Sequence, residues 1–368
     1  MTDTLGVRPT STPPPRPASD APAGRRTAGW MSHPVVWPLL ALIALIVVNV
    51  VATPDFLDIR IENGGLFGNV VDIARNSAPL ILVAVGMTLV VATRGIDLSV
   101  GAVAVIAAAV ACTRIAAAPD EGAVTTVVMA VVWALGASVL LGLWNGLLVS
   151  VFGIQPIIAT LVLMVAGRGL AMLITDGQIT TVQDGAFSSL ASGIVLGLPV
   201  ALLIALAVVV VTALLTRRTA LGMLVEAVGI NPEASRLAGV SARTIVWTVY
   251  VFAATCSGIA GLIIAANTNS VNANSLGLWI ELDAILAVVI GGTALTGGRF
   301  SLAGTVVGAL LIGTLTRTIP NLGIPSEANY LFKALVVIVV CLLQSPRARA
   351  SLLGLRHRRP TTRKAARS

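Results

Sequence analysis

Long apolar stretches alternate with short polar or glycine-containing breaks along most of this chain. Most stretches run for about 17 to 25 residues, the length that an α-helix needs to cross ~30 Å of hydrocarbon. The pattern therefore predicts an all-α integral membrane protein with about ten transmembrane helices. The expected crossings are residues 35–53, 70–92, 98–117, 123–150, 155–175, 199–216, 244–266, 281–292, 301–318 and 329–345.

Composition supports one membrane domain, residues 35–345, rather than several soluble ones. Hydrophobic residues make up 56% of the 368 residues and charged residues only 11%, and the mean hydropathy is +0.95. Such a chain has too little polar surface to cover soluble cores. Aromatic residues contribute only 4%, so we expect helices to approach closely through small residues, such as Gly304, Gly308 and Gly313.

The positive charge is concentrated in segments that flank the predicted crossings. Most of the 24 Lys and Arg residues lie in the two tails, residues 1–34 and 346–368, and in the loop 217–243. Because loops on the cytoplasmic side of a membrane are enriched in Lys and Arg, both termini and this loop are expected to be cytoplasmic. The net charge of +8 is then a matter of membrane orientation, and nucleic acid is not an expected partner.

The two tails are expected to be unlike the membrane domain. Residues 1–34 are rich in Pro, Thr and Arg, which predicts a disordered cytoplasmic tail, and residues 346–368 predict a basic cytoplasmic tail. Arg25 and Arg26 could mimic a twin-arginine signal. The apolar segment that follows lacks the usual small-residue cleavage site, so we expect an uncleaved first helix.

An internal repeat indicates two related five-helix halves. Each copy has an apolar helix, a glycine-containing break, a hydroxyl residue and a second helix of small residues. A shift of 197 residues places Leu89, Gly95, Leu98, Ser99 and Gly101 on Leu286, Gly292, Leu295, Thr296 and Gly298. Duplicated halves with broken helices are common in transporters, although chance similarity between glycine-rich apolar segments is the alternative.

A short charged insert at residues 221–241, LGMLVEAVGINPEASRLAGVS, separates two long apolar stretches. Gly229 and Asn231 provide a turn and a helix cap, Pro232 suits the first helical position, and Gly239 can end the short helix from Glu233 to Leu237. The insert is therefore expected to form a rigid knob that contacts something outside the membrane.

Several polar residues lie within or beside the apolar stretches, where a hydrated path or a gate would need them. The candidates are Asp97, Ser99, Asn145, Gln155, Arg168 and Thr296. Asp97 is equally consistent with capping the third helix, and Asn145 and Gln155 with hydrogen bonds between helices. Glu281 and Asp283 are expected to favour the N-terminal dipole of the helix that follows, with docking of a partner as the alternative.

Three longer segments resemble the permease subunit of sugar ATP-binding-cassette importers of the ribose and galactofuranose type. They read GMTLVVATRGIDLSVG, AVGINPEASRLAGV and ELDAILAVVIGGTALTGG. Four others look like the galactofuranose subgroup in particular, namely LFGNVVDIARNSAP, GLWNGLLV, IQPIIATLVLMVAGRGLAMLITDGQI and TALGMLVEAVGIN. The resemblance covers essentially residues 35–345. The sequence departs from it at Arg94, where members of the subgroup usually carry glycine.

The resemblance implies a multi-pass subunit of the bacterial plasma (inner) membrane that performs no covalent chemistry. It implies four partners besides the lipid bilayer: cytoplasmic ATPase subunits holding ATP and Mg²⁺, a second permease copy or a paralogue, a periplasmic or lipid-anchored sugar-binding protein, and the monosaccharide itself. The knob would then couple this chain to the ATPase. The coupling residues implied are Glu226, Gly229, Asn231, Pro232, Glu233, Ala234 and Gly239.

The chain itself offers no other source of chemistry. It lacks a GxxxxGK[ST] phosphate loop, so energy is expected from another chain or from an ion gradient. Cys112, Cys256 and Cys341 lack disulfide or metal-site spacing, so no cofactor or metal is expected in this chain. The alternatives are an ion-coupled secondary transporter, a membrane enzyme acting on lipid-linked sugars, and a related permease for nucleosides or branched-chain amino acids.

Overall fold

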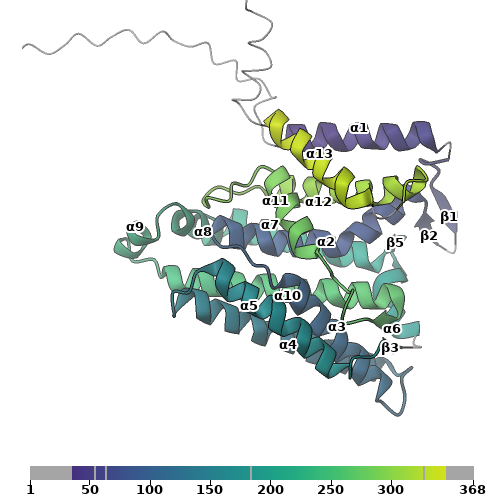
Figure 1. Ribbon diagram of the computed structural model, residues 1–368, viewed down its shortest axis with the longest axis horizontal. Coiled ribbons are helices and arrows are strands. Elements are labelled where there is room, and N and C mark those ends of the chain that lie inside the picture. The colour runs from purple at the N-terminus through teal and green to yellow at the C-terminus, as the bar shows by residue number, and fades with distance from the viewer. Residues whose placement is uncertain (1–34, 54, 63, 183–184, 326–327, 345–368) are drawn as a thin grey trace, which may run out of the picture.

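The computed structural model describes residues 35–53, 55–62, 64–182, 185–325 and 328–344. Within them, there are thirteen α-helices, short connections and three small two-stranded antiparallel sheets (Figure 1). The helices are α1 (Val36–Ala52), α2 (Asn69–Ala92), α3 (Val100–Ala116), α4 (Val124–Ser150), α5 (Pro156–Ile174), α6 (Gly185–Ser192), α7 (Val200–Arg218), α8 (Leu221–Ile230), α9 (Pro232–Leu237), α10 (Ala242–Thr268), α11 (Ile280–Ile290), α12 (Leu302–Asn321) and α13 (Asn329–Gln344). The strands are β1 (Arg60–Glu62), β2 (Gly65–Phe67), β3 (Thr180–Thr181), β4 (Ile194–Val195), β5 (Leu198–Pro199) and β6 (Ser270–Val271).

Each of the ten predicted crossings coincides with a helix. Six helices, α2, α4, α5, α7, α10 and α12, are long and apolar enough to span a membrane. The fold is therefore that of an all-helical, multi-pass membrane protein. The number of ten crossings and the side of the termini stay predictions, and the predicted tails 1–34 and 346–368 lie outside the described residues.

Helix α11 differs from the sequence prediction, which treated residues 281–292 as one crossing. It has 11 residues, so it rises only about 16 Å and cannot span ~30 Å of hydrocarbon. Gly291 ends it at one side, and the connection before it, which contains the buried residues Val271, Ala273 and Leu276, completes the passage through the protein. This segment is a half-helix preceded by a buried loop.

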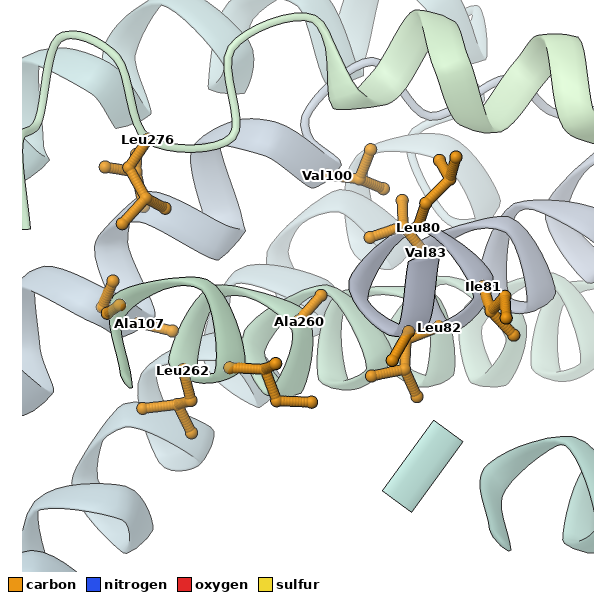
Figure 2. Packing of buried hydrophobic residues seen from close by; sticks show 14 of the residues in the cluster. Leu80, Ile81, Leu82, Val83, Val100, Ala107, Ala260, Leu262 and Leu276 are labelled. Carbon is orange, nitrogen blue, oxygen red and sulfur yellow. The ribbon is translucent and has the colours of Figure 1, made fainter. Parts of the chain in front are cut away.

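Three helices form the centre of the molecule. Helices α2 and α10 are buried along most of their length and pack against α3. Figure 2 shows part of this core, in which Leu80 and Leu82 from α2 and Ala260 and Leu262 from α10 belong to one cluster of buried side chains. Because these helices are apolar on every side, they are suited to the interior of a helical membrane protein.

Helices α4, α5 and α7 surround the core and expose apolar side chains. Trp133 and Leu140 on α4, Val165 on α5 and Val211 on α7 are exposed. Exposed apolar side chains on several outer helices suit contact with lipid or with a second membrane subunit. The outer helices thus give the fold its membrane-facing surface.

Glycines allow helix backbones to touch, as the sequence predicts for α12. A Cβ at Gly304 would overlap the backbone at Gly291, one at Gly308 would overlap the Ala287 carbonyl oxygen, and one at Gly313 would overlap the Ser77 side chain. Only a residue without a side chain fits at these three points. Close packing through α12 is therefore confirmed.

We expect the replacement of Gly261 by valine to destabilise the protein. A Cβ at Gly261 in α10 would overlap the backbone of Ala104 in α3, and forcing such contacts typically costs about 1 to 3 kcal/mol. The measurement is the Tm of the purified protein in detergent. Gly136→Val in α4 is the control, because a Cβ at Gly136 meets nothing within 4 Å; equal Tm values for the two variants would contradict the packing described.

The two ends of the helical bundle are built differently (Figure 1). At one end, which we call the hairpin end, β1 pairs with β2, β4 with β5, and β3 with β6. The β3–β6 pairing joins residues 180–181 to residues 270–271, so two loops far apart in sequence form one surface. At the opposite end, α8 and α9 project from the bundle; we call this the α9 end.

Candidate functional site

The local structure of the 221–241 insert follows from its residues. Asn231 caps α9 by accepting a hydrogen bond from the Ala234 nitrogen at 3.0 Å, and Pro232 occupies the first helical position. Gly239 has a φ of +83°, and its N–H donates to the Arg236 carbonyl. The predicted cap and helix end are present, but Gly229, which was expected in a turn, lies inside the additional helix α8.

The surface of α9 is open and partly apolar. Glu233 and Arg236 form an ion pair at 3.2 Å on its exposed side, and Ala234 is also exposed. The Leu237 side chain is 81% exposed. The projecting surface of α9 therefore carries two charged side chains and one exposed apolar side chain.

The C-terminal end of α8 is wedged between the two glycine-containing breaks of the internal repeat. A Cβ at Gly229 would overlap the carbonyl oxygen of Ala92, the last residue of α2, and would lie 2.7 Å from the nitrogen of Gly298. That Gly298 nitrogen donates to the Ala92 carbonyl at 2.8 Å. Three segments far apart in sequence therefore meet at Gly229.

Arg94 strengthens this junction from the first break. Its guanidinium donates to the Ile230 carbonyl, and its main chain and side chain lie against Gly297. The φ of Arg94 is +65°, a conformation that glycine adopts without cost. This backbone geometry explains why glycine is suited to position 94, and the bond to Ile230 shows what arginine adds.

A groove beside the junction separates α7 and α8 from the second break. Glu226 on α8 lines it together with Arg217, Arg299 and Gly292. The groove thus carries both signs of charge at the α9 end, where polar side chains of another subunit could enter.

A buried polar cluster lies just beyond the first break, at the start of α3. The Asp97 carboxylate accepts hydrogen bonds from the Ser99 nitrogen at 2.9 Å and from the Ser99 hydroxyl at 2.6 Å. Asn145 on α4 donates to the Ser99 hydroxyl oxygen at 2.7 Å. All three side chains are at most 1% exposed, so the cluster fixes the break to α4 in the interior.

The remaining predicted path residues are not part of this cluster. Gln155 precedes α5 and is exposed, and Thr296 is exposed in the second break. Ser99 is buried, so the two hydroxyl residues of the repeat have different surroundings. Arg168 on α5 is half-buried and donates to the carbonyls of Leu276 and Gly277, each at 3.4 Å.

Two features were missed by sequence reasoning. Glu281 is buried, and neither of its carboxyl oxygens has a hydrogen-bond partner among the described residues. The junction at Gly229 also went unrecognised, because the apolar alternation shows no long-range contact. The glycines of the breaks were the available signal for it.

A family model matches residues 69–341, and its description is "Branched-chain amino acid transport system / permease component". The chain belongs to this family. The matched residues include both breaks, the junction at Gly229 and the Asp97 cluster. The family assignment therefore covers the whole site described above.

Curated relatives of this family member are sugar permeases. The galactofuranose transporter permease protein of Escherichia coli is 46% identical over 330 residues, which are 88% of this chain and 95% of that protein. The fructose import permease protein FruF of Bifidobacterium longum is 39% identical, covering 86% and 89% of the two chains. The ribose import permease protein of Haemophilus influenzae is 36% identical, covering 82% and 90%. No solved structure gives a significant match.

Proposed function

We propose that this chain is the transmembrane permease subunit of an ATP-binding-cassette importer for a monosaccharide. The observation that carries the proposal is the exposed α8–α9 knob, whose inner end is wedged at Gly229 between both breaks. A push on α9 from outside would reach α2 through Ala92 and the 291–301 connection through Gly298. Such a contact is what a partner needs to change the access of a transport path.

In this proposal the energy comes from a partner. Cytoplasmic ATPase subunits bind ATP and Mg²⁺, and their closure moves the knob. Glu226 lies in the groove of mixed charge, while Glu233, Ala234 and Leu237 present the outer surface of α9. Asn231, Pro232 and Gly239 keep α9 rigid through its caps, so that force is transmitted rather than absorbed.

The substrate class follows from the relatives. Their printed names refer to galactofuranose, fructose and ribose, so we propose galactofuranose or a related pentose or hexose. A separate periplasmic or lipid-anchored binding protein would deliver the sugar to the hairpin end. A second copy of this chain, or a paralogue, would complete the path in the bacterial inner membrane.

The chain path supports cytoplasmic termini in this proposal. Helix α1 leads into β1 at the hairpin end, so its first residues lie on the side that faces away from the hairpin end (Figure 1). The basic residues Arg217, Arg218 and Arg299 also lie at the α9 end, as the positive-inside rule requires of a cytoplasmic face.

Cysteine labelling would test this orientation. Leu237→Cys in α9 should react with a membrane-impermeant maleimide only in inside-out vesicles, and Leu196→Cys between β4 and β5 only in right-side-out vesicles. Both side chains are strongly exposed, at 81% and 92%. The unmodified protein is the control, because it shows how much maleimide reacts with the native cysteines, of which Cys112 and Cys256 are buried. Labelling with the opposite sidedness would contradict a cytoplasmic knob.

The proposed function itself predicts sugar-stimulated ATP hydrolysis. We expect the purified complex of this chain with its ATPase to hydrolyse ATP faster when sugar-loaded binding protein is added. Galactofuranose, ribose and fructose should be compared, and empty binding protein is the control. A rate that no loaded binding protein changes would refute the assignment.

A further inference from the structure

A second polar site lies deeper in the molecule, where two helices begin. The carboxylate of Glu281, in the first turn of α11, lies against Gly101 in the first turn of α3, since a Cβ at Gly101 would overlap Glu281 Oε2. The Gly277 carbonyl is 2.9 Å from the same Cβ position. Because α11 is a half-helix, this meeting point lies inside the protein, and interior helix starts of this kind are where transporters hold polar ligands.

The carboxylate of Glu281 has an unmet requirement for hydrogen bonds. Glu281 is 1% exposed, and neither Oε1 nor Oε2 has a partner within the described part of the chain. Leaving the oxygens of a buried carboxyl group without hydrogen-bond partners is costly in either protonation state. A state of the protein in which donors reach this carboxylate is therefore expected.

Arg168 on α5 reaches the same meeting point, because its guanidinium donates to the Gly277 carbonyl that lies against Gly101. Its guanidinium interacts electrostatically with Glu281, yet its hydrogen bonds go to the Leu276 and Gly277 carbonyls. Both N···O distances are 3.4 Å, at the long limit for such bonds.

The charges at the site define the ligand. A carboxyl group accepts hydrogen bonds in either protonation state, and a guanidinium only donates them. An anion would be repelled by Glu281 and a cation by Arg168. A neutral molecule with several hydroxyl groups, which both donate and accept, suits the pair.

We propose that Glu281 and Arg168 form a binding site for the hydroxyl groups of the sugar during its passage, with Glu281 as acceptor and Arg168 as donor. This site rests on the proposed function and names residues that touch the sugar within the path. In the present conformation Arg168 is bonded to the Leu276 and Gly277 carbonyls, and it moves off them when sugar enters. The Asp97–Ser99–Asn145 cluster holds the start of α3 in place beneath it.

The experiment measures uptake into proteoliposomes that hold the full complex, with ATP and saturating binding protein. The proteins are the unmodified chain, Glu281→Gln, and the control Glu121→Gln, which removes a carboxylate in the connection between α3 and α4. The probes are the best-transported sugar and its monodeoxy analogues, each with its affinity for the binding protein measured separately. We expect Glu281→Gln to slow uptake of the sugar at least about fivefold, the size of a lost charge-assisted hydrogen bond.

The pattern over the analogues decides the proposal. One analogue lacks the hydroxyl group that Glu281 binds, and the unmodified chain should take it up more slowly than the complete sugar. Glu281→Gln should not reduce the uptake rate of this analogue further, because the substitution and the missing hydroxyl remove the same hydrogen bond. Uptake at the unmodified rate in Glu281→Gln, or an equal slowing of the sugar and every analogue, overturns the proposal. If the complex with Glu281→Gln does not assemble, Arg168→Gln, at a half-buried position, is compared with the unmodified chain on the same sugar and analogues. Failure of the unmodified complex to transport any sugar would instead refute the proposed function.

Discussion

Replacing Gly229 by alanine is expected to lower ATP-driven sugar uptake by at least about tenfold, equivalent to ~1.4 kcal/mol. A Cβ at this position overlaps the Ala92 carbonyl oxygen and crowds the Gly298 nitrogen, so the inner end of α8 must move away from both breaks. The hydrogen bond from Gly298 to Ala92 would be disturbed by the same shift. Uptake and ATP hydrolysis should be measured on one reconstituted preparation.

Gly136→Ala in α4 is the matched control, because its new Cβ meets nothing within 4 Å and alanine favours a helix. We expect Gly136→Ala to behave as the unmodified protein does. In Gly229→Ala, hydrolysis should continue while the response to loaded binding protein is lost. Normal uptake by Gly229→Ala would show that the wedge at Gly229 does not transmit force.

Replacing Asp97 by alanine should produce the second large effect, on both stability and uptake. The change removes the acceptor for the nitrogen and the hydroxyl of Ser99, and leaving buried donors unsatisfied costs about 1 to 3 kcal/mol. The start of α3 would loosen, and uptake should fall with it. The measurements are the Tm of the purified protein and the initial rate of uptake.

Asp120→Ala, at an exposed position between α3 and α4, is the control for the loss of a carboxylate. Asp97→Asn should have the smaller effect of the two Asp97 variants, because its amide oxygen can still accept from Ser99. A Tm for Asp97→Ala equal to that of Asp120→Ala would contradict a structural role for the cluster.

The sequence allowed the helices and the knob to be predicted because both depend on local patterns. Apolar stretches predict ten of the thirteen described helices within a few residues, and α9 follows from Asn231, Pro232 and Gly239, whereas α6 and α8 were not predicted. Glu281 was correctly placed in the first turn of its helix. These features need no knowledge of distant residues.

The contacts of the site could not be predicted in the same way. The junction joins Ala92, Gly229 and Gly298, and their proximity depends on the packing of α2, α8 and the 291–301 connection. The burial of Glu281 depends on the loop before α11 folding back against Gly101. Equally, the exposure of Gln155 and Thr296 reflects where the helices end in space, which their neighbours in sequence do not reveal.

The central claim, that ATP used by a partner drives sugar through this chain, is tested most directly by uptake of radiolabelled sugar into proteoliposomes. They should contain this chain, its ATPase and its binding protein, with ATP supplied only to the ATPase side. Our account predicts uptake that requires ATP, the ATPase and the binding protein together, and that an ion gradient cannot replace. Uptake by this chain alone, driven by an ion gradient, would contradict the account and identify a secondary transporter.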